Sequence, residues 1–276
     1  MRTAIAGEWP GEVAAGAERR AGLALAPVAA PLQAERNRPL IVRLGKQLRG
    51  VFDRLIAASS LVPNDAVLDV RAFPWTAELR DRWQAIRREA IDVALRGDAA
   101  PSLATISPDH RSIAEIGKWR SFFLWGYGYA IEDNLARCPQ TAALVSAIPG
   151  LTTAFFSILA PGTHIPDHRG VTKGLITCHL GLIVPRDGDV RMRLGDRVVR
   201  WAEGETLVFD DTYHHEVWNE TSGTRVVLLI QFERPLKHPG KWFADFFLGF
   251  VRRSAFVQEA RANIRSWNAA IRQIES

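Results

Sequence analysis

The chain has few cysteines and no long apolar run, and each shortage excludes a class of protein. Two of its 276 residues are cysteines, Cys138 and Cys178, and they form no CxxC pair. A disulfide framework and a thiolate zinc site are therefore excluded, and the composition fits a reducing compartment. No apolar run reaches the roughly 20 residues that a membrane-spanning helix needs. We therefore expect a cytoplasmic protein.

The charge balance limits the partners. Lysine and arginine total 35 against 30 aspartate and glutamate residues, which gives a net charge of +5. This mild excess suits an anionic substrate or a membrane surface. No basic run is interleaved with aromatic residues in the manner of a nucleic-acid groove, so nucleic acid is not an expected partner.

The apolar pattern divides the chain into four parts. Residues 1–37 have no clear period and are expected to form a flexible arm. Residues 38–150 are expected to form a helical and mixed region, with helices at Leu40–Ala58, at Thr76–Leu95 and, broken by Pro139, at 131–148. Residues 151–236 form the predicted barrel, and residues 237–276 form a helical tail.

Short apolar runs separated by Gly, Asp and Asn predict many short antiparallel strands in the third part. The expected fold is therefore mainly β with flanking helices. The seven predicted strands are Ala154–Leu159, Leu175–Val184, Val190–Leu194, Val198–Trp201, Thr206–Phe209, His214–Trp218 and Arg225–Phe232.

An aromatic stretch at residues 118–129 precedes the barrel and contains Trp119 and Trp125. It predicts a strand pair packed on the barrel. In the alternative interpretation it is a wall of the substrate cleft, with Trp125 as a substrate contact.

Histidines are concentrated between residues 157 and 225, where five of the seven lie. Single histidines of this kind are usually core or loop residues, but imidazoles on adjacent strands also build open metal sites. His168 and His215 are the two candidate ligands. Non-haem iron sites usually show His-x-Asp/Glu, whereas here Gly170 stands at the carboxylate position. Asp167 would project to the other face of a strand, so no third protein ligand is evident.

Arg225 follows His215 by 10 residues and is expected to lie across a hairpin from it. The two side chains would then be roughly 7 Å apart along the sheet, at ~3.4 Å per residue. This separation suits a five-carbon dicarboxylate that chelates a metal at one end and pairs with arginine at the other. The Ser157 hydroxyl would add a contact at that second end.

These residues and their spacing resemble the aspartyl/asparaginyl β-hydroxylase family of Fe(II)/2-oxoglutarate dioxygenases. Ser157, His168 and His179 follow one another at intervals of 11 residues. The resemblance is carried by Ser157, Pro161-Gly162-Thr163-His164, Asp167-His168, His179-Leu180-Gly181-Leu182, Phe209-Asp210-Asp211, His215-Glu216-Val217-Trp218 and Arg225.

The resemblance implies a double-stranded β-helix with iron on His168 and His215 and with water in place of the usual carboxylate. It also implies that Arg225 and Ser157 hold the distal carboxylate of 2-oxoglutarate, and that His179 holds the carboxylate nearer the metal. The chain departs from the family at Thr177, where better-known members have an arginine. Arg169 or Lys173 is a candidate to compensate.

Three functions follow from the resemblance and its alternatives. The first is hydroxylation of an aspartyl or asparaginyl β-carbon in a small-molecule or peptidyl substrate, the second is hydroxylation of a lipid acyl chain, and the third is a non-catalytic cupin-like module. Arg169, Lys173 and the nearby Lys118–Arg120 segment favour an anionic substrate over a lipid. On that view Phe247 and Phe250 should be buried. Membrane contact is then not the expected interaction, and the C-terminal helix is the part of the chain that could make it.

Overall fold

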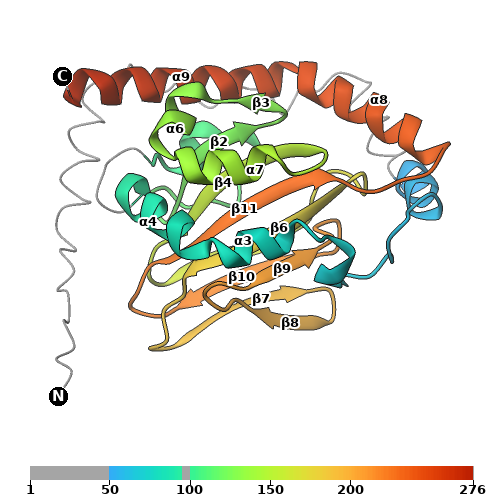
Figure 1. The fold of residues 1–276 in the computed structure, drawn as a ribbon, viewed down its shortest axis with the longest axis horizontal. Helices are drawn as coiled ribbons and strands as arrows, with labels where there is room; N and C mark the ends of the chain where they lie inside the picture. Colours follow the sequence, from blue (N-terminus) through green and yellow to red (C-terminus); the bar gives the residue numbers. More distant parts are fainter. Residues whose placement is uncertain (1–49, 95–99, 276) are drawn as a thin grey trace.

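The computed structural model describes residues 50–94 and 100–275. The expected arm, the start of the first predicted helix and Leu95 lie outside the described residues. The core consists of two antiparallel sheets, one of seven strands in the order β1-β9-β6-β11-β4-β2-β3 and one of four strands in the order β5-β10-β7-β8 (Figure 1). The strands are β1 (Val67–Leu68), β2 (Trp119–Gly126), β3 (Tyr129–Ala130), β4 (Leu151–Leu159), β5 (Thr163–His168), β6 (Leu175–Ile183), β7 (Asp189–Leu194), β8 (Arg197–Arg200), β9 (Thr206–Phe209), β10 (His215–Glu220) and β11 (Arg225–Glu233).

Helices flank the sheets on the outside. Residues 50–58 are helical and are called helix 50–58 below. The predicted helix from Thr76 is divided in two, and Trp75 rather than Thr76 occupies its N-cap position. The remaining helices are η2 (Val70–Ala72), α3 (Thr76–Asp81), α4 (Trp83–Ala94), α5 (Leu103–Ile106), η3 (Pro108–His110), α6 (Glu132–Arg137), α7 (Pro139–Ser146), α8 (Gly240–Arg253) and α9 (Ala255–Glu275).

Strands β4 to β11 form nested antiparallel pairs. β4 pairs with β11, β5 with β10, β6 with β9, and β7 with β8. This pairing is a long hairpin rolled up so that alternate strands enter opposite sheets, which makes a jelly roll. The expected double-stranded β-helix is therefore confirmed.

Two expectations about the barrel strands were wrong. β5 was not predicted, because Pro166 and its polar neighbours lack the apolar alternation typical of a strand. The proline is tolerated because β5 is an edge strand. The hairpin between His215 and Arg225 does not form, since β10 and β11 belong to different sheets. Val217 therefore faces Ile165 and Met192 rather than Arg225.

The larger sheet separates two apolar cores. On its outer face, Phe156 and Leu228 pack with Ile86 of α4 and Val145 of α7. The inner core lies between the sheets and includes Phe155, Val227, Met192 and Val217. β7 shows why the sheets close over it: Val190, Met192 and Leu194 alternate with charged residues and are buried, while the charged residues lie outward.

The aromatic stretch forms β2 and β3, which extend the larger sheet beside β4. This confirms the strand-pair interpretation. After the barrel, α8 and α9 run along one side of the molecule, and α9 passes over β2, β3 and α6 (Figure 1). None of the helices in the described part of the chain is long and apolar enough to cross a bilayer.

Candidate active site

His168 and His215 face each other at one edge of the smaller sheet. They are register partners on β5 and β10, and their ring centroids are 4.1 Å apart. Between this pair and the pair Val217–Ile165, β5 contains one residue more than β10. This bulge turns His168 inward and leaves Asp167 outside, where its carboxylate contacts His214 and Arg193.

Backbone contacts fix the tautomer of both rings. Nδ1 of His168 lies 2.9 Å from the carbonyl oxygen of Pro166, and Nδ1 of His215 lies 2.9 Å from that of Tyr213. A carbonyl only accepts, so each Nδ1 carries the proton and each Nε2 keeps its lone pair. Burial and the nearby His215 lower the pKa of His168 to about 4, and burial also lowers the pKa of His215. Both imidazoles are neutral at pH 7, as metal ligands must be.

Asp211 occupies the space that a carboxylate at position 170 would need. A Cβ added to Gly170 would lie 2.0 Å from Asp211 Oδ1, and the Gly170 N–H donates to the Asp211 carbonyl at 2.7 Å. Thr177 and Gln231 donate to Asp211 Oδ2 at 3.0 and 2.9 Å. Burial nevertheless raises the pKa of Asp211 to about 6. Position 177, where better-known members of the family have an arginine, is therefore occupied by a threonine whose neutral hydroxyl donates to the Asp211 carboxyl group.

His179 presents an unused donor inside the barrel. Trp201 Nε1 donates to His179 Nδ1 at 3.1 Å, and an indole nitrogen only donates, so the proton of His179 resides on Nε2. His179 is 7% exposed, and its Nε2 has no hydrogen-bond partner among the described residues. Buried donors are almost always paired, so this atom marks a place for a ligand.

Arg225 is a second buried residue with unpaired hydrogen-bond donors in the barrel interior. It is 2% exposed, its guanidinium carbon lies 4.7 Å from the centre of the Trp201 ring, and Nε and NH1 have no partner among the described residues. Burial lowers the pKa of Arg225 to about 9. Ser157 lies on the inward side of β4, where Trp119 Nε1 donates to its hydroxyl oxygen at 3.0 Å and leaves the hydroxyl proton free to donate. The site therefore collects donors for an anion.

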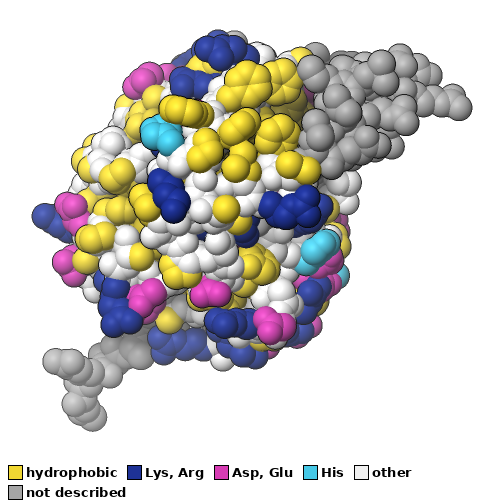
Figure 2. Space-filling model, turned by 90° about the vertical axis from the view of Figure 1, so that its right-hand side faces the viewer, with side chains coloured by type: hydrophobic (Ala, Val, Ile, Leu, Met, Phe, Trp, Pro, Cys, Tyr) yellow, Lys and Arg dark blue, Asp and Glu magenta, His cyan; other side chains and the backbone are white. Residues whose placement is uncertain are grey.

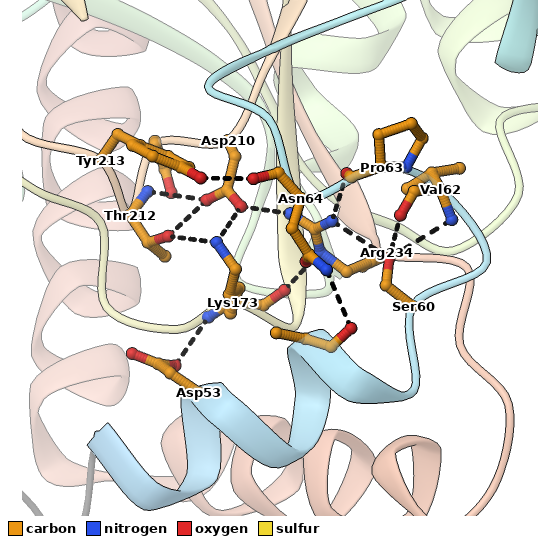
Figure 3. Close-up of polar contacts among 12 residues, drawn as sticks. Asp53, Ser60, Val62, Pro63, Asn64, Lys173, Asp210, Thr212, Tyr213 and Arg234 are labelled. Atoms are coloured by element: carbon orange, nitrogen blue, oxygen red, sulfur yellow. Dashed lines mark hydrogen bonds and ion pairs between the residues drawn. The ribbon is translucent and has the colours of Figure 1, made fainter. Parts of the chain in front are cut away.

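A buried ion network holds the segments that carry the histidines (Figure 3). Asp210 is fully buried and pairs with Lys173, whose Nζ lies 2.7 Å away, and with Arg234. Arg234 Nε also donates to the Lys173 carbonyl at 2.7 Å, and Lys173 N donates to Asp53 of helix 50–58 at 3.1 Å. The network ties the loop after His168 to the segment before His215. Lys173 is thus paired within the protein, and its expected role as a substrate or cofactor contact stays a prediction.

The other two expected substrate contacts are placed differently. Trp125 packs against the outer core of the larger sheet, on the side away from the inner core, and this placement does not support its expected role as a substrate contact. Arg169 is exposed and follows His168 directly.

Sequence reasoning missed His110, whose ring meets Trp119 edge-on at 5.4 Å and whose pKa is lowered to about 4 by burial and by His168. No local motif marks His110, since it comes from η3, far from the barrel in sequence.

Comparison with known proteins decides the family. Residues 80–235, more than half of the chain, match the family model described as aspartyl/asparaginyl beta-hydroxylase. The chain belongs to this family. It is 43% identical over 205 residues to the ornithine lipid ester-linked acyl 2-hydroxylase of Rhizobium tropici, covering 74% of this chain and 73% of that protein. It is 33% identical over 162 residues to human aspartyl/asparaginyl beta-hydroxylase, covering 57% of this chain but 21% of that longer protein.

Membership of the β-hydroxylase family makes the chain an oxidoreductase, a dioxygenase of the hydroxylase type. Among solved structures, a Pseudomonas putida prolyl-4-hydroxylase is 18% identical, with a TM-score of 0.33, and covers 59% of this chain and 100% of that one. An oxidoreductase of the 2OG-Fe(II) oxygenase family from Burkholderia pseudomallei is 14% identical, with a TM-score of 0.34, over 43% of this chain and 68% of that one.

Proposed function

We propose that the protein is an Fe(II)- and 2-oxoglutarate-dependent hydroxylase with iron on Nε2 of His168 and His215. The two imidazoles share one tautomer and a low pKa, which suits an N-donor site for Fe(II). Within residues 50–94 and 100–275, no group of three or more His, Cys, Asp or Glu side chains is arranged to hold a metal. The donor set therefore fits the two-histidine pattern that leaves positions open for other ligands.

The observation that carries the proposal is the set of unpaired buried donors. Arg225 Nε and NH1 and His179 Nε2 have no partners among the described residues, although burial makes unpaired polar atoms costly. A dicarboxylate would satisfy them, with Arg225 and Ser157 at its distal end and His179 at the end nearer the iron. When bound, iron and 2-oxoglutarate would supply the oxidation by dioxygen of an unactivated C–H bond.

The chain's own residues orient the co-substrate and exclude water. Trp201 stacks on the Arg225 guanidinium and fixes the His179 tautomer, so one side chain positions both carboxylate contacts. Phe209 packs edge-on against His179 at 4.9 Å, and Phe155 and Leu159 line the same interior. In this dry interior, the hydrogen bonds to a carboxylate are stronger than in water.

We further propose that the substrate carbon belongs to the ester-linked acyl chain of an amino-acid-containing lipid. The Rhizobium relative, which is matched over most of its length, carries that activity in its name. The structure weakens the case for an anionic peptide, because Lys173 is bound to Asp210. Val171, three residues after His168, is 50% exposed and offers an apolar contact near the site.

An aspartyl or asparaginyl β-carbon remains the second candidate. It is supported by the human relative and by Arg169, an exposed cation directly after His168. We also propose a cytoplasmic location, in keeping with two buried cysteines that are free thiols.

The substrate is tested by product mass. Iron-loaded protein is supplied with 2-oxoglutarate and either ornithine lipid dispersed in detergent or an aspartyl peptide. The proposal expects the mass of one added oxygen on the ester-linked acyl chain, coupled to succinate in equal amount. Hydroxylation of the peptide alone would replace the lipid with the second candidate, and succinate formation with neither product would contradict both.

A further inference from the structure

α8 is apolar on the side that faces solvent. Four of its aromatic residues, Trp242, Phe243, Phe246 and Phe250, are 65%, 40%, 79% and 51% exposed. Phe247 is half-buried, so the expected burial of Phe250 was wrong and that of Phe247 holds only in part. Phe52 of helix 50–58 is 38% exposed, and its ring lies tilted against that of Phe243, with the centroids 6.1 Å apart. Figure 2 looks onto this end of the molecule and shows hydrophobic side chains gathered on its upper part. The α8 face, as we call it, consists of Phe52, Trp242, Phe243, Phe246 and Phe250.

The opposite side of α8 is fixed to the protein. Ala244 is buried, and a Cβ added to Gly174 would lie 3.2 Å from its methyl group. At the start of α8, the N–H of Gly240 donates to the Ser59 hydroxyl at 3.1 Å. A surface helix normally turns its apolar stripe inward and a polar face outward. Since α8 is already packed on one side, its aromatic side is left largely open to solvent: Phe243 contacts Phe52 and Trp242 contacts His238, yet the four α8 rings of this face stay at least 40% exposed.

The charges around the α8 face are mostly positive. Residues 237–253 contain four lysine and arginine residues and one carboxylate, Asp245. Lys241 pairs with Asp245 and with Glu233, and the Arg252 guanidinium lies over the Tyr129 ring, so two positive charges are in excess. The cations flank the aromatic stretch: Lys237 and Lys241 precede Trp242, and Arg252 and Arg253 follow Phe250. Aromatic residues between basic ones are the pattern of a helix that lies in a membrane interface, where rings enter the acyl boundary and cations meet anionic headgroups.

The α8 face also adjoins the candidate active site. The loop at residues 169–174 begins directly after His168, and α8 packs on its far end through Ala244 and Gly174. Helix 50–58 holds the same loop through the bond from Lys173 N to Asp53. Exposed Val171 lies in this loop. A surface resting on the α8 face would therefore lie beside the segment that leads to His168.

We propose that the α8 face docks on an anionic phospholipid bilayer and thereby brings the loop at residues 169–174, which follows His168, to the lipid surface. The link to lipid substrates rests on the proposed function, whereas the docking itself does not. In this arrangement an acyl chain reaches the site from the membrane, and the polar headgroup stays near the exposed Arg169.

The test is sedimentation of the full-length protein with vesicles of phosphatidylethanolamine and phosphatidylglycerol. The wild-type protein is expected to sediment with these vesicles and to be released in part as salt is raised from about 0.05 M to about 0.5 M. The variant Trp242→Ser/Phe246→Ser/Phe250→Ser should bind at least about tenfold more weakly, because it loses three interfacial rings. A matched control, Ile116→Ser/Val198→Ser, removes side chains that are 77% and 53% exposed elsewhere and should bind as wild type does.

Turnover separates docking from the substrate assignment. The triple variant should keep wild-type turnover on detergent-dispersed lipid and lose it on vesicles. Docking is overturned if the wild type does not sediment, if the triple variant sediments equally, or if the α8 face instead mediates self-association that the triple variant abolishes. Sedimentation that depends on the α8 face, without turnover on either form of lipid, would uphold docking and refute the lipid substrate.

Discussion

His168 and His215 are paired across two strands that lie 47 residues apart in the chain, and one extra residue in β5 turns His168 toward its partner. His168→Ala and His215→Ala should each lower Fe(II) affinity by at least about 100-fold, since each removes one of the two proposed protein ligands. His164→Ala and His214→Ala are the controls, because both rings lie outside in contact with Glu216 and Asp167. Anaerobic metal titration measures the affinities, and tight iron binding by either of the first two variants would refute the ligand assignment.

Arg225 should bind the co-substrate but lower the unfolding free energy of the apo protein. Arg225→Met removes a buried, unpaired cation, so the apo protein is expected to gain about 1–3 kcal/mol in unfolding free energy. Arg225→Lys retains the charge but loses the planar fork, so the KM for 2-oxoglutarate should rise about tenfold or more. Urea denaturation and initial rates measure the two effects. An unchanged KM in the lysine variant would remove Arg225 from the carboxylate site.

Gly170 and Asp211 should be energetically coupled. Gly170→Asp restores the usual iron-ligand motif in sequence but forces a side chain against Asp211, so it should destabilise the protein by about 1–3 kcal/mol. Adding Asp211→Ala makes room for that side chain and should recover much of the loss. A double-mutant cycle on unfolding free energies measures the coupling, and additive effects would mean that the two positions do not share the space.

Acid should destabilise the apo protein above the pH range in which ordinary carboxylates, with pKa values of about 4, are titrated. The folded-state pKa values of His168 and His110, about 4, lie below the ordinary value of 6.5, so between these pH values the unfolded state binds more protons. Stability therefore falls as pH drops from 6.5 toward 4, by up to about 1.4 kcal/mol per pH unit for each such histidine.

Asp211 acts in the opposite direction, because its raised pKa makes the folded state hold a proton between pH 3.8 and about 6. Urea denaturation from pH 7 to pH 5 measures the slope for the wild type. His110→Gln cannot take up the proton and should show a shallower slope. The same slope in both proteins would contradict the burial of a neutral His110.

Asp210 should be the main electrostatic support of the site. Asp210→Asn leaves Lys173 and Arg234 buried without their carboxylate, which is expected to cost about 3–5 kcal/mol in unfolding free energy. Asp69→Asn breaks the exposed pair with Arg71 and should cost less than about 1 kcal/mol. Thermal denaturation compares the variants. Equal losses would show that the network in Figure 3 adds little to stability.

Local sequence pattern was sufficient for most strands of the barrel. Alternation predicted β7 because Val190, Met192 and Leu194 are its inward residues. It failed for β5, since an edge strand tolerates Pro166 and exposes polar side chains that resemble a loop. The histidine spacing was visible in sequence, but the bulge that turns His168 inward depends on pairing with a strand far along the chain.

The contacts of the site were harder to predict, because they cross between sheets. The hairpin argument placed Arg225 near His215 along one strand pair, whereas Arg225 lies on β11 in the other sheet and stacks on Trp201. The partner of Lys173 is Asp210, 37 residues away in sequence, and no local feature distinguishes that ion pair from a substrate contact. Tertiary register decides both cases.

The central claim is oxidation driven by 2-oxoglutarate at the two-histidine site. Protein loaded anaerobically with Fe(II) and 2-oxoglutarate is exposed to oxygen, and succinate is measured by mass spectrometry. The wild type should form succinate only when iron, 2-oxoglutarate and oxygen are all present, and His168→Ala should form none beyond the protein-free control. Succinate formation by His168→Ala at the wild-type rate, or none by the wild type with either candidate substrate present, would contradict the account.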